Sequence, residues 1–177
     1  MTLKLDIIDA KNGEFEVKTV KYFLAGWLLW SLWGCAEPDY SQEESAYIVL
    51  KTPAVKYADM GFIYENAHEV KAEIYGNGQA LMTLKISGGS VCMSRLQCMS
   101  QNAFNRAVLS RYYPDDTLEK IFRGEPILDA KNKRTKSNGF TQHIVNQGKY
   151  DIEYSVLNNH IQFRDKINQI LIKVIRQ

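Results

Sequence analysis

The residues that most often carry chemistry are few in this chain of 177 residues, and they lie far apart. The three histidines, His68, His143 and His160, have no second metal ligand at helical or hairpin spacing. This spacing favours scattered surface histidines over a metal centre. The sequence contains no Gly-x-Ser-x-Gly motif and no phosphate-binding glycine loop. We therefore expect neither an enzyme nor a bound cofactor or metal ion.

The thiols offer two other kinds of chemistry. Cys92 and Cys98 form an even pair once Cys35 is set aside, with five residues between them. In an oxidising compartment such a pair predicts a disulfide that closes a short loop. A metal site is the alternative, but no further Cys or His lies close by in the sequence. Cys35 stands at the end of an apolar segment, and the nature of that segment indicates which chemistry to expect at its thiol.

Residues 22–35 read YFLAGWLLWSLWGC, and Lys21 precedes them. This run is too short to span a bilayer, which takes roughly 20 apolar residues. It fits the core of a signal peptide, which has about 7–15. The tryptophans of the chain, at 27, 30 and 33, all lie in this run, as is typical of segments at a membrane surface. A buried core helix that ends in Gly-Cys is the alternative.

The last four residues of this run, Leu-Trp-Gly-Cys, resemble the lipobox of bacterial lipoproteins, although Trp33 is bulkier than that pattern prefers. The resemblance implies cleavage before Cys35 and attachment of lipid, with palmitate among its acyl chains, to this thiol. Ala36 follows where an aspartate would retain an enterobacterial lipoprotein in the inner membrane. The resemblance therefore implies an outer-membrane lipoprotein that faces the periplasm.

The chain then divides into three parts. Residues 1–34 are the expected signal peptide, and Val17 is our interpretation of the true start, since the acidic residues before it do not suit a basic leader. Residues 35–45 form the lipidated cysteine and a polar tether. Residues 46–177 form one lipid-binding domain.

Charge gives no indication of a nucleic-acid partner. Residues 1–34 hold as many basic as acidic residues, so their removal leaves the net charge at +2. The basic run at residues 131–136 reads as a solvated loop, and contact with anionic lipid headgroups is its alternative.

Hydrophobic periodicity predicts an α+β fold. Alternation with a period of two indicates strands, and the turn at Asn77-Gly78 indicates a tight hairpin. In the middle of the chain, helical spacing predicts two short helices, with Ser100 as an N-cap and Gly124 as a stop. The architecture expected is a strongly curved antiparallel sheet, an open half-barrel, with two or three short helices on its concave side. The expected strands are 47–50, 55–64, 69–75, 80–87, 91–93, 140–145, 150–156, 161–163 and 170–174, and the expected helices are 100–112 and 115–124.

Three further motifs lie in the second half of the chain: residues 113–126 (YPDDTLEKIFRGEP), residues 146–154 (NQGKYDIEY) and the final hairpin, HIQFRD at 160–165 with ILIKV at 170–174. They resemble segments of the LolB family of outer-membrane lipoproteins, which receive other lipoproteins from a periplasmic carrier. The resemblance implies a LolA/LolB-like half-barrel with an apolar cavity for acyl chains, and a periplasmic carrier protein as partner. The family carries an exposed apolar residue on a hairpin tip, whereas the matching turn at residues 76–80 is short and lacks leucine.

The resemblance also implies which side chains line the cavity, and a solid core is the alternative for each of them. Those on the concave face are Val70, Ala72, Ile74, Met82, Leu84, Ile86, Tyr150, Ile152, Tyr154, Ile161, Phe163, Ile170 and Ile172. Those of the helical lid are Phe104, Val108, Leu118, Ile121 and Phe122.

Two functions of different classes remain open. The first is a lipid-anchored protein that binds the acyl chains of lipoproteins or other lipids and acts in lipoprotein localisation. The second is a non-catalytic assembly lipoprotein of an envelope complex, for example one for secretion, flagella or lipopolysaccharide export.

Overall fold

The computed structural model describes residues 39–94 and 97–177. The expected signal peptide, Cys35 with its predicted lipid and the first residues of the predicted tether lie outside the described residues. The compact unit formed by the described part runs from Asp39 to Gln177.

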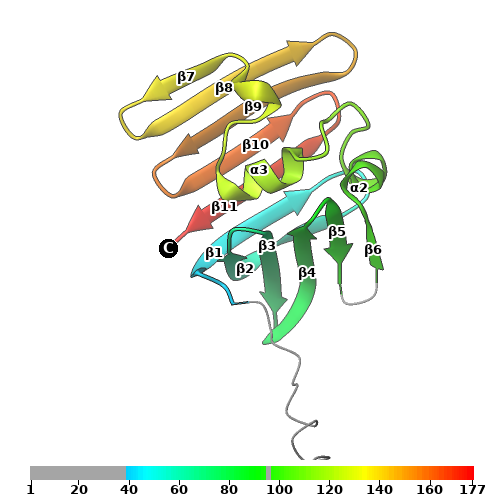
Figure 1. Cartoon of the computed structure of the whole chain (residues 1–177), viewed down its shortest axis with the longest axis vertical. Helices are drawn as coiled ribbons and strands as arrows, with labels where there is room; N and C mark the ends of the chain where they lie inside the picture. The colour runs from blue at the N-terminus through cyan, green and yellow to red at the C-terminus, as the bar shows by residue number, and fades with distance from the viewer. Residues whose placement is uncertain (1–38, 95–96) are drawn as a thin grey trace, which may run out of the picture. The chain divides into compact units, whose positions relative to one another are not determined.

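The described residues form one antiparallel sheet of eleven strands, in the order β6-β5-β4-β3-β2-β1-β11-β10-β9-β8-β7 (Figure 1). The sheet is open, with β6 and β7 as its edges. The strands are β1 Gln42–Lys51, β2 Lys56–Glu65, β3 Glu69–Gly76, β4 Gln79–Ser87, β5 Ser90–Met93, β6 Gln97–Ser100, β7 Lys133–Lys136, β8 Gly139–Asn146, β9 Tyr150–Leu157, β10 His160–Asp165 and β11 Ile170–Arg176. The helices are α2 Gln101–Val108, α3 Thr117–Arg123 and the 3-10 helix η1 Leu128–Ala130.

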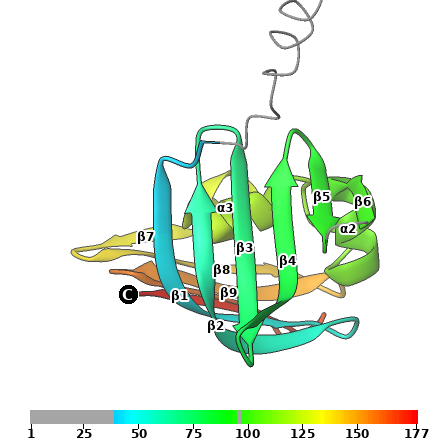
Figure 2. The same ribbon diagram turned by 90° about the horizontal axis from the view of Figure 1, so that it is seen from below.

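The first and last strands join the two halves of the sheet. β1 pairs with β2 on one side and with β11 on the other, so that Ile48 lies opposite Val174 and Leu50 opposite Ile172. Figure 2 shows the strands of the first half running at a marked angle to those of the second half, as the twist of a large sheet produces. The two halves therefore share one continuous hydrogen-bonded ladder.

Local sequence explains one tight turn and one close approach between strands. Asn77 and Gly78 adopt positive φ angles of 51° and 77°, which the tight turn between β3 and β4 requires. On β2, a Cβ atom at Gly61 would lie 1.8 Å from the carbonyl oxygen of Glu73. Only glycine allows β2 and β3 to approach this closely.

The helix ends follow their predicted caps in two places. The Ser100 hydroxyl accepts a hydrogen bond from the backbone N–H of Ala103 at 3.2 Å, which confirms the predicted N-cap. Gly124 ends α3 in the left-handed conformation, with φ of 69°. Asp116 precedes α3 without a side-chain capping bond and instead pairs with Lys120 at 2.7 Å.

Several elements differ from the sequence predictions. Helix α2 ends at Val108, so the prediction that it reaches residue 112 is wrong. Strand β1 begins at Gln42, within the stretch expected as tether, because its first residues pair with the end of β2. Strands β6 and β7 and helix η1 were not predicted. Residues 133–136, expected as loop, are exposed but pair with β8.

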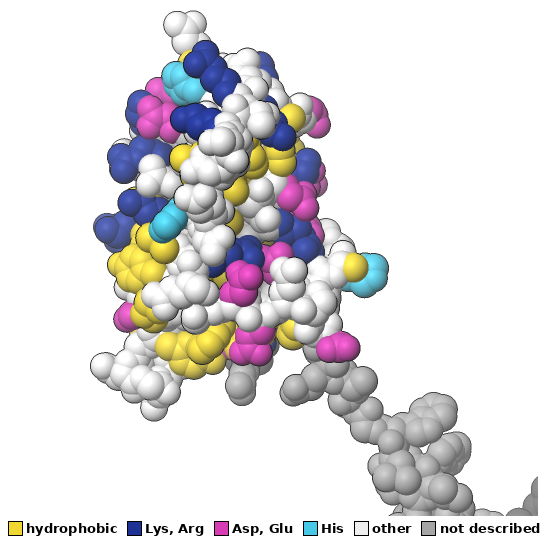
Figure 3. Space-filling view, turned by 90° about the vertical axis from the view of Figure 1, so that its left-hand side faces the viewer, with side chains coloured by type: hydrophobic (Ala, Val, Ile, Leu, Met, Phe, Trp, Pro, Cys, Tyr) yellow, Lys and Arg dark blue, Asp and Glu magenta, His cyan; other side chains and the backbone are white. Residues whose placement is uncertain are grey.

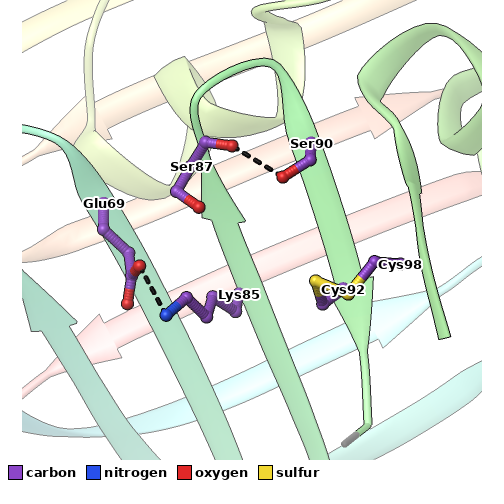
Figure 4. Close-up of a disulfide and its surroundings, with 6 residues drawn as sticks. All are labelled: Glu69, Lys85, Ser87, Ser90, Cys92 and Cys98. Carbon is purple, nitrogen blue, oxygen red and sulfur yellow. Dashed lines mark hydrogen bonds and ion pairs between the residues drawn. A yellow bond between two sulfur atoms is a disulfide. The ribbon is translucent and has the colours of Figure 1, made fainter. Parts of the chain in front are cut away.

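The predicted disulfide is present. Cys92 on β5 and Cys98 on β6 lie directly opposite each other and are bonded (Figure 4). On the same strand β5, the Ser90 hydroxyl donates a hydrogen bond to the carbonyl of Ser87 at the end of β4, and Lys85 on β4 forms an ion pair with Glu69 on β3. The bridge therefore fastens the edge strand that leads directly into α2.

Candidate functional site

The inner face of the sheet is the face whose side chains are buried against α2 and α3, and the outer face is the opposite one. Every second residue of the longer strands points to the inner face, for example Ala72 and Ile74 on β3 and Ile170 and Ile172 on β11. This is the alternation that a strand with one buried face requires. Helix α3 lies in front of the middle strands in Figure 1, and α2 lies beside β5 and β6.

The structure brings the predicted cavity residues together in one buried cluster on the inner face. All of them are buried except Val108, which is half-buried and packs against the cluster. Sequence reasoning missed further members, although period-two alternation places some of them, such as Ile48, Leu50 and Val174, on the same face. The members that were missed are Ala46, Ile48, Leu50, Ile63, Val91, Leu109, Tyr113, Ile127, Phe140, Ile144 and Val174.

Close packing fills the middle of this cluster. Ile74, Leu84, Ile121, Phe122 and Phe163 have no exposed surface. A side chain without accessible surface adjoins no space wide enough for a water molecule. In this structure an acyl chain can therefore reach these residues only if protein side chains move aside.

Aromatic rings pack in the part of the cluster formed by the second half of the sheet. The Phe163 ring makes edge-on contacts with the Tyr113 ring, at 5.8 Å between centroids, and with the Tyr154 ring at 6.2 Å. The Phe140 ring contacts that of Tyr154 at 5.6 Å. Such edge-on pairs stabilise a packed core by more than their buried area alone.

One buried carboxylate serves the fold. Asp165 accepts hydrogen bonds from the Tyr113 hydroxyl and from the backbone N–H groups of Asp151, Ile167 and Asn168. Burial, together with this hydrogen bond to Asp165, raises the pKa of Tyr113. Because the carboxylate oxygens are engaged by protein donors, the arrangement stabilises the β10–β11 turn and leaves no free base for chemistry.

Polar contacts fasten α3 over the inner face. The Arg176 guanidinium on β11 donates to the carbonyl of Phe122 at 2.8 Å and also pairs with Glu44 at 3.0 Å and with Glu65. At the same helix, Arg123 donates to the carbonyl of Asn66 at 3.0 Å. These bonds connect the helix to strands in the first half of the sheet and to the last strand.

A second set of bonds holds the segment that follows α3. The Gln142 amide on β8 accepts from the backbone N–H of Ile127 and donates to the carbonyls of Ile127 and Lys131, at 2.8–3.0 Å. The Tyr154 hydroxyl donates to the carbonyl of Glu125 at 3.0 Å. Burial, with a smaller contribution from Glu125, raises the pKa of Tyr154.

The described residues contain no group of three or more His, Cys, Asp or Glu side chains that could hold a metal ion. His143 pairs with Asp151 at 2.9 Å, and His68 and His160 are exposed. Among residues 39–94 and 97–177, no helix is both long and apolar enough to cross a bilayer.

Surface grooves on the described part of the chain are lined mainly by polar side chains. One of them, about 800 Å³, lies over β7 to β10 and includes Arg134, Thr141, His143, Glu153 and Ser155. Leu81, one residue beyond the turn at residues 76–80, is 55% exposed. Sequence reasoning overlooked this leucine because it looked only at the turn itself.

Comparison of the chain with protein-family models and with curated proteins gives no match. The expectations drawn from the LolB resemblance therefore stay predictions.

Proposed function

We propose that this chain is a lipid-anchored outer-membrane lipoprotein that faces the periplasm and binds acyl chains between the inner face of its sheet and helices α2 and α3. It would accept these chains, or lipoproteins that carry them, from a periplasmic carrier, and it would need no covalent chemistry. The observation that carries the proposal is the single apolar cluster that both halves of the sheet share with two short helices.

The contacts of α3 support a strongly curved, half-barrel sheet as part of this proposal. Helix α3 contacts both β3 and β10, which are separated in the sheet by β2, β1 and β11. In a flat sheet, four strand spacings of about 4.8 Å would put these strands roughly 19 Å apart. A helix is only about 10 Å wide, so a sheet that bends around α3 accounts for both contacts.

Energetics permit an acyl chain to replace the helices. Moving Phe104, Leu118, Ile121 and Phe122 out of the cluster would cost about 6–12 kcal/mol, at about 1.5–3 kcal/mol for each side chain. Burying roughly fifteen CH₂ groups of a fatty acyl chain would contribute about 12 kcal/mol relative to leaving these groups in water. The two terms are close, so the closed structure is compatible with reversible loading.

Leu81 supports contact with a membrane during such transfer. It is exposed beside the β3–β4 hairpin tip, where the LolB family carries an exposed apolar residue. Although the turn at residues 76–80 itself lacks leucine, Leu81 therefore supplies an exposed apolar side chain close to the hairpin tip.

Native mass spectrometry of the purified protein, together with displacement of a fluorescent fatty acid, tests acyl binding. We expect co-purified acyl chains and saturable probe binding. An Ile121→Ala variant, which opens space under α3, should bind the probe more tightly, whereas Tyr112→Ala, on an exposed side chain, should not. If no acyl ligand co-purifies and neither the parent protein nor Ile121→Ala binds the probe, acyl binding is disproved.

The close packing of the inner face favours a second candidate, an assembly lipoprotein that acts through its surface in an envelope complex. Such a protein needs a rigid core and a stable partner. Cross-linking in cells, followed by purification under the conditions used to test acyl binding, distinguishes the two candidate functions. A stoichiometric protein partner, together with an interior that holds no acyl ligand and is filled by protein side chains, would favour assembly over acyl binding.

A further inference from the structure

The outer face of β10, β11, β1 and β2 carries basic side chains that have no acidic partner. Arg164 lies opposite Leu171, Leu171 opposite Lys51, and Lys51 opposite Lys56, so the four residues form one row across four strands. Lys173 lies on the same face, two residues along β11 from Leu171. The basic residues of this face are therefore Lys51, Lys56, Arg164 and Lys173. Within the part of the chain that the structure describes, none of them forms an ion pair or a hydrogen bond through its side chain.

Several other basic residues of the sheet and its turns form ion pairs with acids, unlike those of this row. Lys85 pairs with Glu69 at 2.7 Å, and Lys166 pairs at 2.6 Å with Glu153, the acid that lies opposite Arg164 on β9. Two lysines directly opposite each other, as at Lys51 and Lys56, destabilise a sheet. The fold therefore gains nothing from this row, whereas an anionic ligand would.

An apolar row lies on the same face, four residues along β1 from Lys51, and the row of Lys173, Val49 and Ala58 lies between the two. Tyr47 lies opposite both Ile175 and Met60, and Phe62 follows on β2. Tyr47, Met60 and Phe62 are 38%, 39% and 37% exposed. In Figure 3, hydrophobic side chains gather on one side of the molecule below a group of Lys and Arg side chains. Basic and amphipathic side chains on one face of a sheet match the phosphate layer and the interface of a bilayer.

The N-terminal end of the described chain also lies on the outer face. The Tyr40 ring packs against that of Tyr64 at 5.4 Å, and the Lys71 ammonium lies over both rings. Tyr64 and Lys71 are opposite each other on β2 and β3. Cys35 precedes Tyr40 by five residues, and five extended residues reach at most about 17 Å. A lipid on Cys35 therefore keeps this face close to the membrane.

From these observations we infer that the outer face of β10, β11, β1 and β2 docks on the surface of a bilayer that contains anionic phospholipid. The inference rests on the proposed lipid anchor at Cys35. Lys51, Lys56, Arg164 and Lys173 contact lipid phosphates, and Tyr47, Met60 and Phe62 enter the interface. Docking in this way leaves α2 and α3, on the inner face, turned away from the membrane and open to a soluble carrier.

Quenching of a single tryptophan by brominated lipids tests the docked orientation. The three native tryptophans all precede Cys35, so the processed lipoprotein has none, and its intact mass shows whether Cys35 carries lipid. We would place one reporter by Met60→Trp on the outer face and a control reporter by Tyr112→Trp, whose side chain is 37% exposed and follows α2. Each protein is inserted into brominated phosphatidylcholine vesicles with or without about 30% phosphatidylglycerol.

With phosphatidylglycerol, the Met60→Trp reporter should be quenched about twofold more than the control reporter, and salt should abolish the difference. The triple variant Lys51→Gln, Lys56→Gln, Lys173→Gln should lower docking about 100-fold, since each lysine near an anionic surface contributes about fivefold. The matched triple variant Lys131→Gln, Lys133→Gln, Lys149→Gln makes the same change in charge at exposed positions outside the row and should dock normally.

Equal quenching of the two reporters in a lipidated protein would overturn the docking inference and leave the anchor intact. Equal loss in the two triple variants would also overturn it, because docking would then follow net charge alone. A processed chain without lipid on Cys35 would remove the anchor and the docking inference together. Loss of acyl-probe binding affects neither result.

Discussion

The two faces of the sheet differ in what their apolar residues do. On the inner face, apolar side chains from both halves of the sheet and from α2 and α3 meet in one cluster and are almost completely buried. On the outer face, Tyr47, Met60 and Phe62 stay more than a third exposed beside basic residues that lack partners. Burial explains the first set through stability. The second set contributes little to folding, so it is the better place to look for an interaction with another molecule.

The largest difference in unfolding free energy should appear when one phenylalanine on each face is replaced by alanine. Phe163, fully buried on β10, should cost about 3–5 kcal/mol in unfolding free energy when replaced by alanine, because a cavity forms beside the Tyr113 and Tyr154 rings. Phe62→Ala on the outer face should cost about 1 kcal/mol or less. Urea denaturation measures both. Similar losses for the two variants would contradict the division between the faces.

Arg176 gives the next largest effect, because it connects the inner face with α3. Arg176→Gln should lower the unfolding free energy by about 2–3 kcal/mol, less than for a fully buried pair, since Arg176 and Glu65 remain 14% and 13% exposed. Its neighbour Lys173, on the outer face, serves as the control, and Lys173→Gln should change stability by less than about 0.5 kcal/mol. Hydrogen exchange should also show faster opening of α3 only in the Arg176 variant.

Removal of the disulfide tests how much it stabilises the β5–β6 edge of the sheet next to α2. Replacing both Cys92 and Cys98 by serine should cost about 2 kcal/mol, the chain entropy of closing a short loop. Reductant should lower the stability of the parent protein by a similar amount and leave the serine variant unchanged. An unchanged denaturation midpoint in reductant would show that this edge is held by packing alone.

The smallest effect concerns Tyr64 and is confined to high pH. Burial, and then the charges of Glu73 and Glu43, raise the pKa of Tyr64 to about 12. An unfolded tyrosine has a pKa near 10, so unfolding releases a proton between about pH 10 and 12, and stability falls as the pH rises through that interval. Tyr64→Phe should remove this part of the fall and change nothing in the pH dependence below about pH 9. A phenolate difference spectrum of the two proteins that titrates near pH 10 would contradict the raised pKa.

Strand positions were predicted best where one face had to be buried. The alternation in residues 69–75, 80–87 and 150–156 located β3, β4 and β9 to within about two residues at either end. The polar strand β7, with the sequence Lys-Arg-Thr-Lys, could not be predicted, because its place in the sheet depends on pairing with β8 and not on burial. Helix α2 ends before the apolar pattern does. Leu109 and Tyr113 are buried although they lie in the loop after the helix, so an apolar pattern alone does not mark the helix end.

The amino-acid sequence by itself determined the period of the longer strands and the Cys92–Cys98 pair, because both follow from local spacing, and it indicated part of the set of side chains that meet on the inner face. Only the tertiary structure decided that the inner side chains fill the space between sheet and helices, and that unpaired lysines from β1, β2 and β11 lie together on the outer face. The physical reason is that packing and like-charge proximity depend on which strands pair, and strand pairing joins residues that are more than 100 positions apart in the chain.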